Sequence, residues 1–236
     1  MTSESVTLYI TAASIGFFHT LLGPDHYVPF IAMSKAGNWT PVKTSLITLV
    51  CGIGHVAGSV IIGLVGVVFG VAIMKVEALE AFRGNLAAWA LMGFGLVYLI
   101  WGLRKAAKGT PHEHKHEYLN GRAHAHEHAH NGAYAHVHYG ENKNITPWVL
   151  FTIFVLGPCE PLIPLLMYPA AKQDLTGLVI VTAVFGAATL LTMTVIVLAL
   201  SYGFKMIRLG RAERYVHAVA GAMILLSGAA IQFLGL

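Results

Sequence analysis

Residues 19–30 read HTLLGPDHYVPF and place two histidines and an aspartate around a Gly-Pro pair. They lie inside an apolar run that begins near Val6. Proline lacks a backbone N–H and its ring clashes with the preceding helical turn, so a helix is expected to break here. Backbone groups freed by a break must be satisfied inside the protein or in a wet cavity, because lipid offers no partners. The stretch therefore predicts a broken membrane helix with polar side chains at the break.

The composition supports a membrane protein. The chain of 236 residues is 56% hydrophobic and 11% charged, with a mean hydropathy of +0.67, whereas soluble domains carry roughly 25% charged residues. A helix needs about 20 apolar residues to cross a bilayer. Six segments approach or exceed this length: 6–33, 44–73, 86–103, 146–169, 175–203 and 215–236. The start MTSESVTLYI lacks a basic region, so we expect the first segment to be a retained helix and not a signal peptide.

Lysine and arginine placement predicts the orientation. Loops after the first, third and fifth segments hold 12 basic residues, and the opposite side holds three. The 12 are Lys35, Lys43, Arg104, Lys105, Lys108, Lys115, Arg122, Lys143, Lys205, Arg208, Arg211 and Arg214, against Lys75, Arg83 and Lys172. Because basic residues favour the cytoplasmic side, we expect an inner-membrane protein with both termini outside. This use of the positive charge requires no nucleic-acid partner.

An internal repeat appears when the sequence is shifted by 134 positions. Leu22, Gly23 and Pro24 then fall on Leu156, Gly157 and Pro158, without a gap from 17 to 64. Three segments per repeat is an odd number, so the two copies must enter the membrane in opposite orientations. The sequence thus predicts an all-α membrane protein of six transmembrane helices, built as two inverted three-helix repeats with broken first and fourth helices. Such transporters bind substrate near the midplane, at the broken helices.

This fold divides the chain into three parts. We expect the first repeat at 1–103, a His-rich cytoplasmic loop without regular structure at 104–145, and the second repeat at 146–236. The loop carries nine of the 13 histidines, in HxH units that are typical of metal-binding tracts. They are His112, His114, His116, His124, His126, His128, His130, His136 and His138.

Ionisable residues gather at the two predicted breaks. His19, Asp25 and His26 flank the first, and His55 follows in the next apolar segment. Cys159 and Glu160 occupy the positions of the second repeat that match Asp25 and His26. Each charged group at the bilayer centre costs about 2.5–3.5 kcal/mol on insertion scales, so these groups are expected to share partners, a cation or a wet cavity. We predict that these six residues are metal ligands.

The ligand chemistry indicates the class of metal. Imidazole and carboxylate suit borderline divalent ions such as Ni²⁺, Co²⁺ and Zn²⁺, and a set with one thiolate argues against a dedicated Cu(I) site. We expect the ion to be a transported substrate and not a permanently bound cofactor. Protons compete for the same groups, so they could also couple transport to a proton gradient.

These residues carry a family resemblance. HTLLGPDH resembles the first-helix signature of the nickel/cobalt transporter superfamily, especially its UreH-like membrane proteins, and GIGHVAGSV resembles the second-helix motif. LGPCEPLIP resembles the GPC segment of related sulfite-exporter-like and CcdA-like membrane proteins. The resemblance implies His19, Asp25 and His26 as primary metal ligands and His55 as an additional one.

The resulting hypothesis is a secondary transporter of Ni²⁺ or Co²⁺ in efflux or homeostasis, and not an enzyme. Its partners would be the metal ion and membrane lipid, with a homo-oligomer or a metallochaperone left open. Four alternatives remain open at this point: an accessory protein of metalloenzyme maturation, a sulfite or thiol exporter, an intramembrane zinc hydrolase, and a thiol electron relay. The relay would need Cys51 and Cys159 to face each other.

Overall fold

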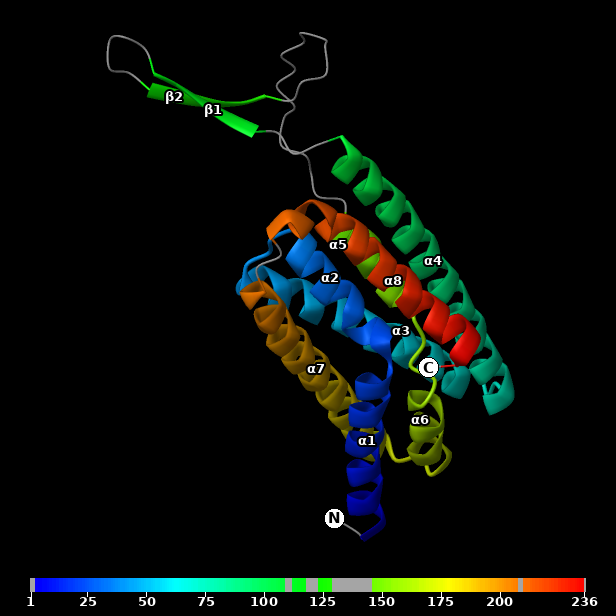
Figure 1. Ribbon diagram of the computed structural model, residues 1–236. Coiled ribbons are helices and arrows are strands. Elements are labelled where there is room, and N and C mark those ends of the chain that lie inside the picture. Colours follow the sequence, from blue (N-terminus) through cyan, green and yellow to red (C-terminus); the bar gives the residue numbers. More distant parts are fainter. Residues whose placement is uncertain (1–2, 109–111, 118–122, 129–145, 208–209, 236) are drawn as a thin grey trace.

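The computed structural model describes the chain except residues 1–2, 109–111, 118–122, 129–145, 208–209 and 236 (Figure 1). Its helices are α1 (Ser3–Leu22), α2 (Val28–Ala36), α3 (Pro41–Val68), α4 (Ile73–Ala107), α5 (Thr146–Leu156), α6 (Leu162–Ala171), α7 (Leu175–Met206) and α8 (Val216–Leu234). Two 3-10 turns, η1 (Pro24–His26) and η2 (Gly210–Tyr215), precede α2 and α8. The predicted helical class of the two repeats is therefore confirmed.

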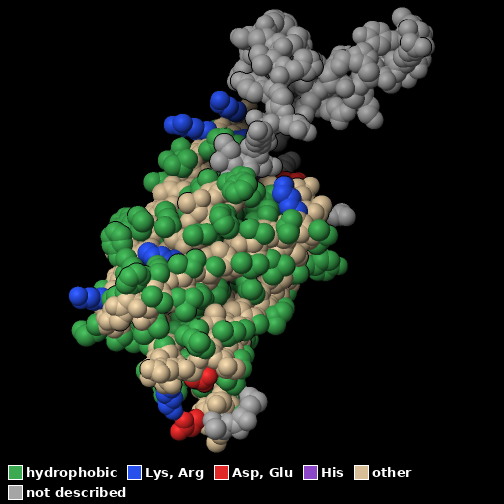
Figure 2. Space-filling view, turned by 180° about the vertical axis from the view of Figure 1, so that it is seen from behind, with side chains coloured by type: hydrophobic (Ala, Val, Ile, Leu, Met, Phe, Trp, Pro, Cys, Tyr) green, Lys and Arg blue, Asp and Glu red, His purple; other side chains and the backbone are tan. Residues whose placement is uncertain are grey.

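Within the described part of the chain, five helical segments are long and apolar enough to cross a membrane, judged by length and composition. They are Ser3–Leu22, Pro41–Val68, Ile73–Ala107, Leu175–Met206 and Ala212–Leu234. The apolar helices α5 and α6 are each too short to cross alone. Figure 2 shows hydrophobic side chains spread over one face of the bundle. Large apolar residues such as Ile61, Leu191 and Val97 are 60–68% exposed, as expected of a surface that faces lipid.

Both predicted breaks are present. In the first, α1 ends at Leu22 and α2 begins at Val28; in the second, α5 ends at Leu156 and α6 begins at Leu162. Each of these bounds shifts onto its counterpart by the same 134 positions that align the two halves of the sequence. The breaks arise because Gly23–Pro24 and Gly157–Pro158 interrupt the helical hydrogen bonds.

The predicted third apolar segment, 86–103, is too short. Helix α4 already begins at Ile73, so Lys75 and Arg83 lie within it and not in an external loop. Glu80 and Arg83 do not end the helix, because they form an ion pair one turn apart and are largely buried. The charged residues between the second and third apolar segments therefore do not mark a loop.

The predicted irregular loop also differs in part. Two of its segments form antiparallel strands, β1 (His112–Glu117) and β2 (Ala123–His128). The register sets histidine positions opposite one another: His112 with His128, His114 with His126, and His116 with His124. The predicted ligands His130, His136 and His138 lie outside the described residues.

Helices α4 and α8 pack side by side along much of their length (Figure 1). A Cβ built on Gly95 would lie 2.8 Å from the Cα of Leu225, and one built on Gly221 would lie 2.6 Å from the Cα of Leu99. Small residues allow this close backbone approach, which supplies packing energy that lipid cannot. The other close pairs are α1 with α7, α3 with α7, and α3 with α5.

We predict that Gly95→Ala destabilises the protein by about 1–3 kcal/mol, because the added methyl group overpacks the α4–α8 contact. The matched control is Gly93→Ala on the same helix, where an added Cβ would meet nothing within 4 Å. That change should raise stability by about 0.5–1 kcal/mol through helix propensity. Thermal unfolding in detergent measures both, and equal shifts for the two variants would contradict the packing described here.

Candidate metal centre

The first break places His26 in the interior of the bundle. Gly23 ends the α1 hydrogen-bonding pattern by donating its N–H to His19 O at 3.0 Å, and its own carbonyl accepts from the His26 N–H at 3.1 Å. The resulting turn, η1, carries Pro24 at its start and ends at His26. Because the chain leaves the helical path here, the His26 side chain points back toward α1 and α3.

Three histidines meet at this break. His19 comes from α1, His26 from η1 and His55 from α3, and their ligand atoms all lie within 4.8 Å of one another. His26 and His55 are each 2% exposed. The centroid of the His26 ring lies 4.8 Å from that of the His19 ring and 5.0 Å from that of the His55 ring. Two nitrogens that bind one ion lie at most about 4.2 Å apart, because each metal–nitrogen bond is about 2.1 Å long. A small inward movement of the rings would therefore let one ion contact all three.

The Nδ1 atoms of two of these rings are already occupied. His26 Nδ1 lies 3.0 Å from Asp25 Oδ1 and 3.2 Å from Gly23 O. His55 Nδ1 lies 3.2 Å from Phe154 O, at the end of α5. With Nδ1 as the donor, each ring keeps the lone pair on Nε2. Metal-binding histidines are usually oriented in this way, by a carboxylate or a backbone carbonyl on the other nitrogen.

The three Nε2 atoms have no partner of their own. Those of His19, His26 and His55 are buried and make no hydrogen bond within the described part of the chain. Burying such an atom without a partner costs roughly 1–3 kcal/mol. Three neighbouring imidazoles, each with an unpaired nitrogen, are therefore suited to a cation with borderline ligand preference, such as Ni²⁺, Co²⁺ or Zn²⁺.

Asp25 lies beside the histidines. Its carboxylate pairs with His26 and lines a cavity of about 30 Å³ together with His55, Gly84, Ala87 and other residues of α4, α5 and α8. A cavity of this size holds about one water molecule. Asp25 thus provides a negative charge next to the centre, beside a space that can hold a water molecule.

The structure does not bring Cys159 and Glu160 into the three-histidine group. Cys159 is fully buried in an apolar cluster that includes Val56, Leu162 and Leu166. Glu160 is exposed near the end of the second break, two residues before α6 begins. Their role as ligands remains a prediction without a supporting contact in the described residues.

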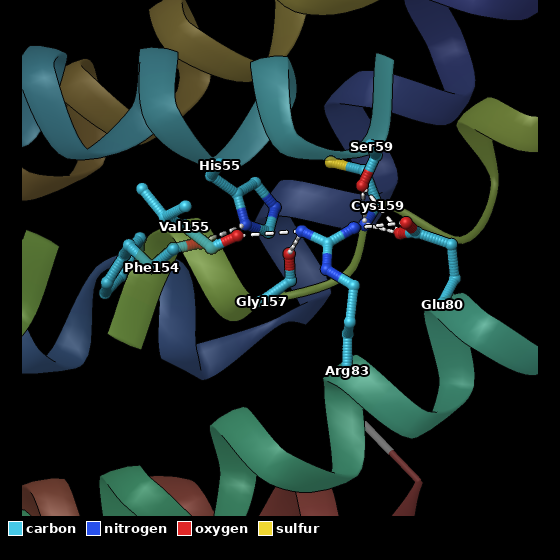
Figure 3. A network of polar contacts seen from close by, with 8 residues as sticks. All are labelled: His55, Ser59, Glu80, Arg83, Phe154, Val155, Gly157 and Cys159. Atoms are coloured by element: carbon cyan, nitrogen blue, oxygen red, sulfur yellow. Dashed lines mark hydrogen bonds and ion pairs between the residues drawn. The ribbon is translucent and has the colours of Figure 1, made fainter. Parts of the chain in front are cut away.

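Sequence reasoning missed a second polar cluster, at the break between α5 and α6 (Figure 3). Glu80 and Arg83 of α4 form an ion pair, and Ser59 of α3 donates its hydroxyl to Glu80 Oε2 at 2.6 Å. Arg83 Nη2 donates to Val155 O at 2.7 Å. Opposite charges three residues apart are the signal that predicts a helical pair, and it is visible in the sequence once α4 is extended to Ile73.

Comparison with known proteins gives a family match. Residues 28–230 match the family model described as "cytochrome C biogenesis protein transmembrane region". The match covers α2 to most of α8, and therefore the second break. Helix α1 and the first break, with His19, Asp25 and His26, precede the matched range. No curated protein gives a significant match. The same holds for solved structures.

We predict that Gly23→Ala lowers Co²⁺ affinity about 10-fold or more, in the range found when an orienting partner of a ligand is lost. Its Cβ would lie 2.9 Å from Asp25 Oδ1 and would also press on His26 Nδ1, so the pair must shift. Gly186→Ala is the matched control, since its Cβ would make an ordinary contact of 3.5 Å with Val56. Titration with Co²⁺ of purified protein whose nine loop histidines are replaced by asparagine measures both. Equal affinities would show that the Asp25–His26 pair does not orient a ligand.

Proposed function

The chain belongs to the family of the cytochrome C biogenesis protein transmembrane region, and from that premise we propose that it is a secondary transporter of a divalent transition metal. Ni²⁺ and Co²⁺ are the favoured substrates. The binding site is the three-histidine centre at the first break, with Asp25 as its carboxylate.

One observation carries this proposal: three buried histidines, each with an unpaired Nε2, gather where a membrane helix is interrupted. Ionisable groups inside a membrane are expensive and usually mark an ion pathway. A packing role would not explain why all three rings leave the same nitrogen free. Three imidazoles on two helices and a turn also suit release, because a movement of α1 against α3 separates the ligands.

We further propose that the bundle has six crossings arranged as an inverted repeat. Helices α5 and α6 together then form the interrupted fourth crossing. Two packing relations support the symmetry: α1 packs on α7, and their repeat counterparts α5 and α3 also pack on each other. Helices α4 and α8, which end the two repeats, are a mutual pair.

The proposed orientation places the His-rich tract in the cytoplasm of a plasma-membrane protein. Lysines gather at the same end of the bundle as this tract: Lys35 donates to Phe204 O at 2.9 Å, and Lys205 donates to Trp39 O. The Lys172–Glu4 pair lies at the other end. This basic end fits the cytoplasmic side, where the tract would collect ions and pass them to the membrane centre.

The family description favours one second candidate, a thiol electron relay. Such a relay needs two cysteines that can react with each other. Here Cys51 and Cys159 are free and belong to two separate apolar clusters. Metal transport requires the histidines and Asp25, whereas the relay requires the two cysteines, so substitutions can distinguish the two candidates.

The test is Co²⁺ uptake into proteoliposomes that enclose a fluorescent metal indicator, with the nine loop histidines replaced by asparagine so that only the membrane centre binds metal. We expect His26→Ala and Asp25→Asn to slow uptake at least about 10-fold, since each removes a ligand or its orienting partner. His217→Ala is the matched control, because this histidine lies away from the centre and bonds to Tyr98 and Lys105.

The double variant Cys51→Ala, Cys159→Ala should transport at the parental rate. Uptake that survives His26→Ala would sink the transport proposal. Loss of a membrane redox activity in the double cysteine variant, without any metal uptake by the parent, would favour the relay instead.

A further inference from the structure

The second break is held by a pair of opposite charges. Arg83 Nη2 donates to Val155 O at 2.7 Å and to Gly157 O at 3.4 Å, at the carbonyl end of α5. Glu80 Oε2 accepts from the Cys159 N–H at 3.3 Å, just before α6. A cation thus lies at the negative end of one helix, and an anion lies near the positive start of the next.

This cluster is buried within the membrane-spanning region. The Glu80 side chain is fully buried and that of Arg83 is 11% exposed. The Glu80 carboxylate has three kinds of donor, namely Arg83, the Ser59 hydroxyl and the Cys159 N–H. Removing one partner of such a buried pair leaves an uncompensated charge. The position of the α5 end is therefore strongly fixed.

The surrounding glycines leave room for this arrangement. A Cβ on Gly58 would lie 2.6 Å from Arg83 Nη2 and 3.0 Å from Val155 O, and a Cβ on Gly84 would lie 2.7 Å from the ring of Pro158. Helices α3 and α4 can thus both approach the break closely enough for Arg83 to reach its carbonyls.

The same helix end also holds a ligand of the metal centre. His55 Nδ1 lies 3.2 Å from Phe154 O, and the next carbonyl along the chain, that of Val155, accepts from Arg83. Figure 3 shows the His55 ring and the Arg83 guanidinium approaching this short segment together. A Cβ on Gly157 would lie 3.0 Å from His55 Nδ1, so a small shift of the segment would reach the ring.

We propose that Arg83, fixed by Glu80, is a positioning residue of the three-histidine centre. It anchors the carbonyl end of α5, and Phe154 O then orients His55 so that its Nε2 faces His19 and His26. This inference rests on the proposed metal site. It assigns the second break a role in holding a ligand of the first.

The test is Co²⁺ titration of the full-length protein, in the background with the nine loop histidines replaced by asparagine, read out by the ligand-field absorption of bound Co²⁺. We expect Arg83→Met to lower affinity about 10- to 100-fold, the usual cost of losing an outer-shell partner, and to alter the absorption bands. Arg83→Lys should recover part of the affinity, because lysine keeps the charge but lacks the planar fork that serves several acceptors.

Arg104→Met is the matched control, an exposed arginine of the same helix, and it should change neither readout. A purely structural role of Arg83 would lower the unfolding temperature without altering the affinity or the spectrum of the folded protein. Unchanged affinity and spectrum in Arg83→Met would therefore overturn the inference.

Should Arg83→Met fail to fold, Arg83→Lys decides: parental affinity and bands would overturn the inference, and weaker binding with altered bands would support it. The parent separates the two proposals. If it binds no Co²⁺, the metal site itself is wrong, whereas a parent that binds alongside an unaffected Arg83 variant contradicts only the positioning role.

Discussion

The requirement that every buried backbone group find a partner governs this structure. Two interruptions in membrane helices free carbonyl and N–H groups that lipid cannot satisfy. At the first, the turn around Gly23 satisfies its own backbone, and its carbonyl also receives the His26 ring. At the second, a guanidinium and a carboxylate supplied by α4 satisfy the chain. The same need for partners has been met locally in one half and by a neighbouring helix in the other.

The two breaks therefore differ in which polar groups they leave unpaired. The self-satisfied break leaves its histidine nitrogens free toward the interior, where they can receive a cation. The other break is already filled by a permanent cation of the protein, the Arg83 guanidinium, which lies against the carbonyls of Val155 and Gly157. Under the proposed function, the first break is the binding element and the second break is its anchor. His55 joins them, because its ring contacts the anchored helix end while facing the binding element.

Much of this arrangement could be predicted from the sequence. Gly-Pro pairs at 23–24 and 157–158 located both breaks, since proline chemistry acts locally, and the spacing of His19, Asp25 and His26 indicated a shared site. The Glu80–Arg83 pair escaped prediction because charges were counted as loop markers, although burial and mutual pairing allow them within a membrane helix. The fate of Cys159 depended on side-chain direction after the break, and repeat alignment carries no such information: the position matched to Asp25 faces apolar neighbours.

The glycine contact between α4 and α8 has a mechanical consequence. The backbones of α4 and α8 are in direct contact at these glycines, so a sliding or tilting movement of one helix against the other would produce clashes. The two helices are therefore expected to move together as a rigid pair. Arg83 belongs to this rigid pair and hydrogen-bonds to the end of α5. The carbonyl partner of His55, Phe154 O, is therefore coupled to the same pair of helices. Helix α1, which carries His19, packs mainly on α7 instead, so the ligands His19 and His55 are attached to different parts of the bundle.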